Sequence, residues 1–224
     1  MNSPSTIIFD VNETLLDLAP LKESVGRALG GRQELSTLWF TTMTHYSVVE
    51  TMTGTFRPFS EIGVGVLQMM ANSHGIEMTR VAAERAIEEP LSELTTHPDV
   101  LPAMKALRND GYRLITLTNS PASGSEEQLE KTGISAYLDR RYSVETVQKF
   151  KPHPSTYEYV LKDQNVDASE TVMVAAHAWD LAGAHQVGLQ TGFVARKGCS
   201  LYPNAPHPDF VMTSLVELAP LLRK

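Results

Sequence analysis

The 224-residue sequence lacks several features, and each absence excludes a class of protein. Cys199 is the single cysteine, so no disulfide can form within the chain, as is usual in a reducing compartment. No apolar run approaches the roughly 18 residues of a membrane span. The amino-terminal stretch MNSPSTIIFD has no basic segment of the kind that begins a signal peptide. We therefore expect a cytoplasmic protein with no membrane partner.

Positive charge is also scarce. The formal net charge is −7, from 26 acidic and 19 basic residues. This balance argues against a nucleic-acid partner, although a local basic pocket can still bind a small anion. The sequence also lacks internal repeats and low-complexity segments. Its length suits one core, with room for an inserted subdomain.

What the sequence does contain is an alternation of short apolar runs with helical patterns. Strands that alternate with helices are typical of α/β proteins with a doubly wound parallel sheet. Such sheets bind ligands beyond the carboxyl ends of their strands. The predicted strands are 6–9, 112–117, 171–175 and 190–195, and the predicted helices are 100–109, 125–131, 155–162 and 180–187.

The segment from residue 18 to about residue 95 breaks this alternation. Helical patterns follow one another there without a strand, and glycines such as Gly54 and Gly75 separate them. We predict a helical cap subdomain inserted after the first strand. Residues 1–16 and 96–224 would then form the core, and residues 17–95 a four-helix cap. The predicted cap helices are 21–29, 34–52, 59–73 and 79–88.

The first predicted strand ends in the stretch FDVNETLLD, which places the carboxylate of Asp10 in a polar turn. A carboxylate at the end of a parallel strand faces the ligand crevice, where it can act as a nucleophile. Backbone N–H groups of the turn at residues 12–14 can stabilise an anion beside it. Aspartate is also a common turn residue. This stretch alone leaves both interpretations open.

Three further positions carry polar side chains at predicted strand ends. Thr118 and Asn119 follow the second strand, where they can bind an anion or leaving group, or cap a turn. Lys151 precedes a proline, which favours extended backbone, and its ammonium either points into the crevice or lies in solvent. Asp180 follows the third strand and either faces the crevice or is the N-cap of the next helix. Together with Asp10, they form a more specific pattern of four successive strand ends.

In this order, the aspartate, threonine, lysine and aspartate resemble the four motifs of the haloacid dehalogenase superfamily. The resemblance covers essentially the whole chain and implies a Rossmann-like core with an inserted cap. Most members are magnesium-dependent phosphatases, with a second aspartate two residues after the nucleophile and an additional acid in the last motif. Here these positions are Asn12 and Ala176, so an acid/base group and a metal ligand are missing.

Further details resemble the metal-independent L-2-haloacid dehalogenases of this superfamily. They are the spacing from Asp10 to Thr14, the lysine of Lys151-Pro152, Tyr157 six residues later, and the Ala-Trp-Asp sequence that ends at Asp180. In that family the aspartate displaces halide from a 2-haloacid, and water hydrolyses the resulting ester to a 2-hydroxy acid of inverted configuration. A halide leaving group needs no proton, which accounts for the missing second acid.

The resemblance assigns a role to each matching residue. Asp10 is the nucleophile, Lys151 keeps it ionised, and Asp180 helps to activate the hydrolytic water. Thr118 helps to bind the substrate carboxylate, and Asn119 faces the departing halide. The other assignments are Thr14 as a hydrogen-bond partner near the nucleophile, Tyr157 as a support of the lysine and aspartate, and Asn12 at the substrate.

The chain departs from that family at several positions. The family's arginine that gathers substrate and halide follows a tryptophan, and Phe40 stands there instead. The serine and asparagine that precede the Ala-Trp-Asp sequence are Ala175 and His177 here. His177 is either a general base for ester hydrolysis or a neutral histidine that satisfies a loop carbonyl. The aromatic residues either line an apolar substrate pocket or pack cap against core; they are Phe40, Phe56, Phe59 and Trp179.

These observations predict a hydrolase with an aspartate nucleophile, an (S)-2-haloacid dehalogenase that converts L-2-haloacids to D-2-hydroxy acids. We expect a small acid as substrate, no cofactor, no metal, and a homodimer with the second cap helix as candidate interface. Two alternatives stay open: a magnesium phosphatase with a degenerate site, and a non-catalytic binding protein on the same fold. No zinc site is expected, because four histidines lack ligand spacing: His97, His153, His185 and His207.

Overall fold

The computed structural model describes residues 4–223. The chain divides into two compact units, one of Met1–Leu16 with Thr96–Lys224 and one of Asp17–Thr95. We call them the core unit and the cap unit and describe each by itself. Among the helices within residues 4–223, none has the length and apolarity needed to cross a membrane.

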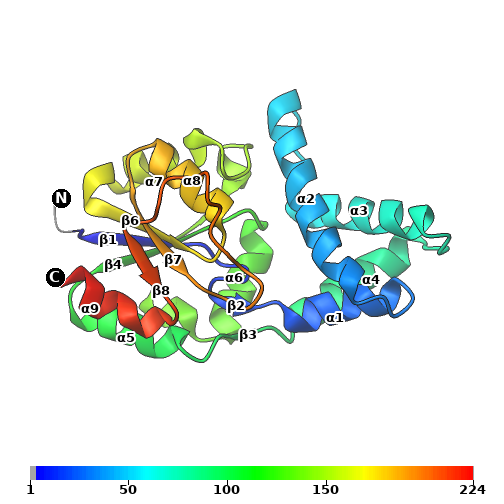
Figure 1. Ribbon diagram of the computed structural model, residues 1–224, viewed down its shortest axis with the longest axis horizontal. Helices are drawn as coiled ribbons and strands as arrows, with labels where there is room; N and C mark the ends of the chain where they lie inside the picture. Colours follow the sequence, from blue (N-terminus) through cyan, green and yellow to red (C-terminus); the bar gives the residue numbers. More distant parts are fainter. Residues whose placement is uncertain (1–3, 224) are drawn as a thin grey trace. The chain divides into compact units, whose positions relative to one another are not determined.

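Six short strands build the sheet of the core unit: β1 (Thr6–Phe9), β4 (Arg113–Thr118), β5 (Arg140–Ser143), β6 (Thr171–Ala175), β7 (Gln190–Val194) and β8 (Phe210–Met212). All neighbouring strands are parallel, in the order β5-β4-β1-β6-β7-β8 (Figure 1). In the central strand, Phe9 pairs with Thr116 of β4 and Val174 of β6. The sheet therefore extends from β1 in both directions, which confirms the predicted doubly wound parallel sheet.

Five helices belong to the core unit: α5 (Val100–Asn109), α6 (Ala122–Lys131), α7 (Pro154–Gln164), α8 (Ala178–Gln186) and α9 (Leu218–Leu222). Helices α7 and α8 lie on one face of the sheet, and α5 and α9 lie on the other (Figure 1). A sheet covered on both faces needs apolar side chains on both sides of each strand. Every residue of β1, β6 and β7 is accordingly buried.

Two strands of the sheet, β5 and β8, were not predicted from the sequence. Strand β5 has the sequence RRYS, and both of its arginines are exposed. Strand β8 has three residues. Both lie at the edges of the sheet, where strands are short and commonly charged, so neither shows the apolar run that marks the inner strands.

The cap unit consists of four helices: α1 (Ala19–Ala28), α2 (Glu34–Thr53), α3 (Phe59–Ser73) and α4 (Arg80–Leu91). Short strands β2 (Leu16–Asp17) and β3 (Thr95–Thr96) pair where the chain passes between the units. Helices α2 and α3 approach closely at Gly63, whose carbonyl accepts a 2.9 Å hydrogen bond from Nε1 of Trp39. A side chain at position 63 would meet Met43, so the absence of one lets these helices pack.

Candidate active site

Asp10 follows the last residue of β1, and its side chain is 7% exposed. Its N–H donates to the carbonyl of Val174 at 3.0 Å, which extends the sheet by one residue and fixes the carboxylate at the strand end. Oδ1 accepts from Nζ of Lys151 at 2.8 Å. Oδ2 accepts from the hydroxyl of Thr14 at 2.7 Å and lies 3.3 Å from Nδ1 of His177.

Lys151 is fully buried, and its ammonium makes three hydrogen bonds. Nζ donates to Oδ1 of Asp10 at 2.8 Å, to Oδ2 of Asp180 at 2.6 Å and to the carbonyl of Leu117 at 3.0 Å. An ammonium has three protons, so these partners use all of them. The expectation that Lys151 directly follows a strand is wrong, because β5 ends at Ser143 and a 3₁₀ turn and a loop intervene.

The charges of this network support one another. Burial alone would raise the pKa of the Asp10 carboxyl, but the ammonium of Lys151 and the contact with His177 hold that pKa well below its usual value. Burial would lower the pKa of Lys151, but the two carboxylates raise it above the usual value. Asp10 is therefore ionised, and Lys151 is charged, throughout the neutral pH range.

Asp180 lies in the first turn of α8, and its side chain is fully buried. The helix begins at Ala178 with His177 as the N-cap residue, so the interpretation of Asp180 as an N-cap is wrong. Oδ2 accepts from Lys151, and Oδ1 accepts from the hydroxyl of Tyr157 at 2.6 Å. Burial and the charge of Asp180 raise the pKa of Tyr157 well above the usual value, which keeps this hydroxyl a donor.

Thr14 fixes the turn that follows Asp10. Its hydroxyl donates to Oδ2 of Asp10 and accepts from the N–H of Ala176 at 2.9 Å. Its carbonyl accepts from Nε and Nη2 of Arg196 at 3.1 and 2.9 Å. Nη1 of Arg196 pairs with Asp99 at 2.8 Å. Arg196 was not predicted, because nothing in the sequence connects a loop after β7 with the turn at residue 14.

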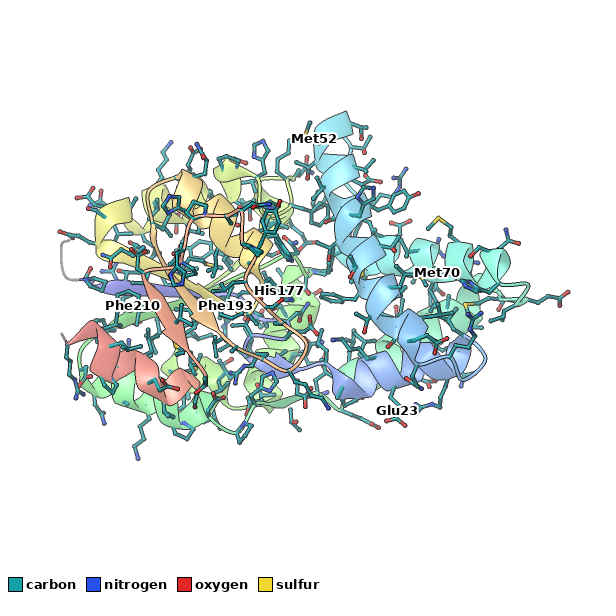
Figure 2. All side chains as sticks on the ribbon, viewed as in Figure 1. Glu23, Met52, Met70, His177, Phe193 and Phe210 are labelled. Carbon is teal, nitrogen blue, oxygen red and sulfur yellow. The ribbon has the colours of Figure 1, made fainter. Side chains whose placement is uncertain are left out.

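His177, which is labelled in Figure 2, lies between the carboxylates of Asp10 and Glu13. Its Nδ1 faces Asp10, and its Nε2 lies 2.8 Å from Oε2 of Glu13. The ring stacks on Trp179 with centroids 5.3 Å apart. Burial would lower the pKa of His177, but the two carboxylates outweigh burial and raise that pKa to about 9. Glu13 was missed in the sequence, because the direction of its side chain depends on a left-handed backbone at that residue, with a φ of 61°.

The predicted substrate-binding residues of the core unit already have protein partners. Asn119 accepts the backbone N–H of Lys151 at 3.0 Å and so helps to hold the lysine. The hydroxyl of Thr118 accepts from the N–H of Ser120 at 3.1 Å. The amide of Asn12 donates to the hydroxyl of Ser120 at 3.0 Å.

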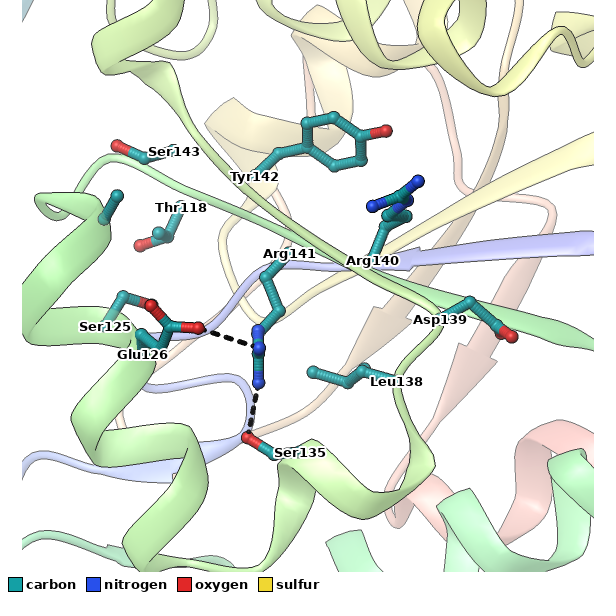
Figure 3. A pocket seen from close by; sticks show the side chains of 11 residues that line it. Thr118, Ser125, Glu126, Ser135, Leu138, Asp139, Arg140, Arg141, Tyr142 and Ser143 are labelled. Carbon is teal, nitrogen blue, oxygen red and sulfur yellow. Dashed lines mark hydrogen bonds and ion pairs between the residues drawn. The ribbon is translucent and has the colours of Figure 1, made fainter.

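A hollow of about 300 Å³ lies beside β5, and Thr118 is the one predicted site residue among those that line it (Figure 3). Arg141 reaches across it to Glu126 at 2.8 Å and Ser135 at 2.9 Å. Its guanidinium is therefore already paired, and we place the chemistry at Asp10 rather than here.

Phe40 and Phe59, two of the aromatic residues predicted for the substrate pocket, belong to the cap unit. Phe40 is half-buried, and Nζ of Lys22 lies 5.9 Å from the centre of its ring. Phe59 is the first residue of α3 and is buried. Their contact with a substrate stays a prediction.

The side chains of a glutamate, a histidine and a cysteine also meet at this site. Within residues 4–223, one group of three potential ligands comes together: Glu13, His177 and Cys199, with ligand atoms within 4.8 Å of one another. The four histidines considered in the sequence are not among them.

The chain matches the family model of the haloacid dehalogenase-like hydrolases over residues 4–188, and it belongs to that family. It is 27% identical to haloacetate dehalogenase H-2 of a Moraxella species over 222 residues, which cover 97% of this chain and 99% of the relative. It is 28% identical to (S)-2-haloacid dehalogenase 1 of a Pseudomonas species over 217 residues, covering 96% and 95% of the two chains.

The fold is shared with solved structures. The L-2-haloacid dehalogenase of Xanthobacter autotrophicus superposes with a TM-score of 0.89 over 98% of both chains, at 23% identity. A second structure of that enzyme has chloropropionic acid bound covalently. At this identity the likeness concerns the fold.

Proposed function

We propose that the protein is an (S)-2-haloacid dehalogenase that uses Asp10 as a covalent nucleophile. The observation that carries this proposal is the buried carboxylate of Asp10, which Lys151 holds ionised through a 2.8 Å ion pair. A carboxylate is a weak nucleophile in water, and removing it from water while keeping its charge makes it more reactive. The curated relatives named as haloacetate and (S)-2-haloacid dehalogenases support the choice of substrate class.

In this reaction an oxygen of Asp10 attacks Cα of a small 2-haloacid, and the halide leaves with the bonding electrons. Water then attacks the carbonyl carbon of the Asp10 ester and releases a 2-hydroxy acid. Lys151 and Thr14 hold the two oxygens of Asp10 in place for both steps. In the second step the same donors can stabilise the negative charge that develops on the ester carbonyl.

The magnesium phosphatase is disfavoured by the geometry of the residues that would hold the metal. Magnesium in proteins requires carboxylate oxygens that are free to bind it. The ammonium of Lys151 lies between Asp10 and Asp180, and both oxygens of Asp180 already accept hydrogen bonds. The residues present therefore do not fit magnesium, and we propose a reaction without a metal or another cofactor.

We also propose that the protein is cytoplasmic and forms a homodimer through α2. The support for the dimer is a set of large apolar side chains that this helix exposes: Leu38, Tyr46, Val48 and Met52. Burial of such side chains in an interface would be favourable.

Halide release tests the function. The wild-type chain and Asp10→Asn are incubated with the L and D forms of 2-chloropropionate and with bromoacetate, all in EDTA. We expect halide release from the L form and from bromoacetate with the wild type and none above background with Asp10→Asn. Asp139→Asn, which alters an exposed aspartate of the core unit that pairs with Arg108, serves as a matched control. Equal release by the wild type and Asp10→Asn would refute the proposal.

A further inference from the structure

Glu13 and His177 lie on the more exposed side of Asp10. The side chain of His177 is 11% exposed, and that of Lys151 on the other side is 1% exposed. Both ring nitrogens of His177 face carboxylate oxygens, at 2.8 Å from Glu13 and 3.3 Å from Asp10. An ionised carboxylate accepts hydrogen bonds and donates none, so both nitrogens donate. The ring is therefore a cation as long as Asp10 is ionised.

This cation depends on both of its carboxylates. His177 is the N-cap residue of α8, where the helix dipole disfavours positive charge. The ring is also largely buried, which disfavours charge as well. Glu13 and Asp10 offset both effects, so removal of either negative charge shifts the ring toward its neutral form.

The backbone of Glu13 supports a functional role for its side chain. A left-handed backbone is unfavourable for any residue with a Cβ, and such conformations persist where the surroundings enforce them. The carbonyl of Glu13 lies 3.0 Å from Nε2 of His97, and Arg196 binds the next carbonyl along the chain. These contacts fix the turn in the conformation that brings the Glu13 carboxylate to His177.

Asp180 is poorly arranged to take a proton from water. Its side chain is fully buried, and its two oxygens accept from Lys151 and Tyr157. His177 contacts the same oxygen of Asp10 as Thr14 does and is the more exposed of the two candidates. Water that attacks the Asp10 ester can therefore reach the imidazole more readily than it can reach Asp180.

We propose that Glu13 and His177 form a proton-transfer pair for hydrolysis of the Asp10 ester, in which the imidazole becomes the base for the hydrolytic water once Asp10 is esterified. His177 is the catalytic residue of the pair, and Glu13 is a positioning residue that acts through it. This inference rests on the proposed dehalogenase function and concerns the second half of its reaction.

The proton balance follows from the loss and return of the Asp10 charge. Alkylation forms the ester and expels halide, and Nδ1 of His177 then releases its proton to solvent. As the water oxygen bonds to the ester carbonyl carbon, Nδ1 takes a proton from that water. The bond from this carbon to the ester oxygen breaks, and the departing alkoxide takes the proton of the added hydroxyl. Asp10 and His177 regain their charges, and each turnover consumes one water and releases one halide and one proton.

The groups around the ring favour a proton over a metal ion. Asp10 and Glu13 face its nitrogens, Trp179 stacks on it, and Lys151 bonds to the other oxygen of Asp10. Cys199 contributes a sulfur to the same cluster. A metal ion needs a deprotonated ring nitrogen, whereas both nitrogens already share protons with carboxylates.

The test separates the two halves of the reaction. Wild type, His177→Asn, Glu13→Gln and the control Glu127→Gln are mixed with excess L-2-chloropropionate between pH 6 and pH 9.5. Chloride is measured in rapidly quenched samples, intact chains are weighed by mass spectrometry, and peptide mapping distinguishes an ester on Asp10 from an adduct on Cys199. Glu127 is exposed and pairs with Lys131 at 2.6 Å, so its replacement reports on a carboxylate outside the site.

We expect one equivalent of chloride from His177→Asn and Glu13→Gln at close to the wild-type rate, followed by slow turnover with the Asp10 ester accumulated. General-base catalysis contributes about 10²-fold or more, so steady turnover should fall by about that factor in His177→Asn and by roughly tenfold in Glu13→Gln. In Glu13→Gln the acidic limb of the pH–rate profile for ester hydrolysis should move to lower pH, because the His177 ring has lost a carboxylate that favours its cation. A purely structural role of Glu13 would not move that limb.

Two results would overturn the inference while leaving the proposed function intact. In one, the variants release the first equivalent of chloride more slowly than the wild type, by the same factor as their turnover falls, and no Asp10 ester accumulates. The other is turnover in both variants equal to that of the control. Absence of chloride release by the wild type would instead refute the dehalogenase function, and this inference with it.

Discussion

The two oxygens of the Asp10 carboxylate have different surroundings. Oδ1 contacts Lys151, which is buried and joined to the equally buried Asp180. Oδ2 contacts Thr14 and His177, and the histidine retains some exposure to solvent. The first side is a set of buried charged groups that bond to one another, and the second contains a histidine whose protonation the carboxylates control.

This difference matches the two tasks that a carboxylate nucleophile has in a covalent mechanism. It must be ionised before it attacks, and it must be released from its ester afterwards. The ammonium of Lys151 serves the first task because two carboxylates keep it charged. The imidazole of His177 suits the second, because one of the carboxylates that hold its proton is the group that the reaction consumes.

The largest effect should come from Lys151→Met, which removes the buried ammonium beside Oδ1 of Asp10. Breaking a buried ion pair leaves an uncompensated charge and costs about 3–5 kcal/mol of folding free energy. Without the ammonium, burial raises the pKa of Asp10, so less of the nucleophile is ionised at neutral pH. We expect a loss of halide release of more than about 10³-fold, with residual activity that increases toward alkaline pH.

Urea denaturation and the pH profile of the halide burst measure these effects. Lys131→Met is the matched control, since this half-exposed lysine pairs with an exposed glutamate at 2.6 Å. A Lys151→Met chain with wild-type activity at pH 7 would contradict the role of the ammonium.

The inner part of this fold could be predicted because its strands are buried on both faces. The predicted bounds of β1 and β6 agree with the structure, since apolar runs with polar ends define them. The edge strands β5 and β8 were missed, because one is charged and the other has three residues. Pairing with a neighbour, rather than composition, makes these segments strands.

The site was predictable to the extent that the carboxyl ends of parallel strands meet. Asp10 and Asp180 follow neighbouring strands, and the structure brings both to Lys151. Glu13 and Arg196 could not be found in this way. Their contacts depend on the left-handed backbone at one residue and on the path of a distant loop.

A smaller effect is expected in the contribution of His177 to the free energy of unfolding, which should depend on pH. The pKa of His177 is raised to about 9, so its charged form stabilises the fold fully below the unfolded pKa near 6.5. That contribution, up to about 3 kcal/mol, is lost as the pH rises toward and through 9. The difference in unfolding free energy between the wild type and His177→Asn should therefore be largest at pH 6 and shrink by pH 10.

Chemical denaturation at a series of pH values measures this difference. His185→Asn alters an exposed histidine near the end of the same helix and should give a difference that varies little over the range. A His177→Asn difference that grows with pH would show that the ring is not held as a cation in the native state.

The smallest effect concerns the backbone of Glu13. Both Glu13→Gly and Glu13→Ala remove the carboxylate from His177, so both lose one charge-assisted hydrogen bond, about 1.5–3 kcal/mol. They differ in the left-handed backbone, which glycine adopts without strain and alanine does not. We expect Glu13→Gly to be more stable than Glu13→Ala by about 1 kcal/mol in urea denaturation at pH 7. If the alanine variant were equally stable, the turn would not be strained, and the position of the Glu13 carboxylate would follow from its bond to His177 alone.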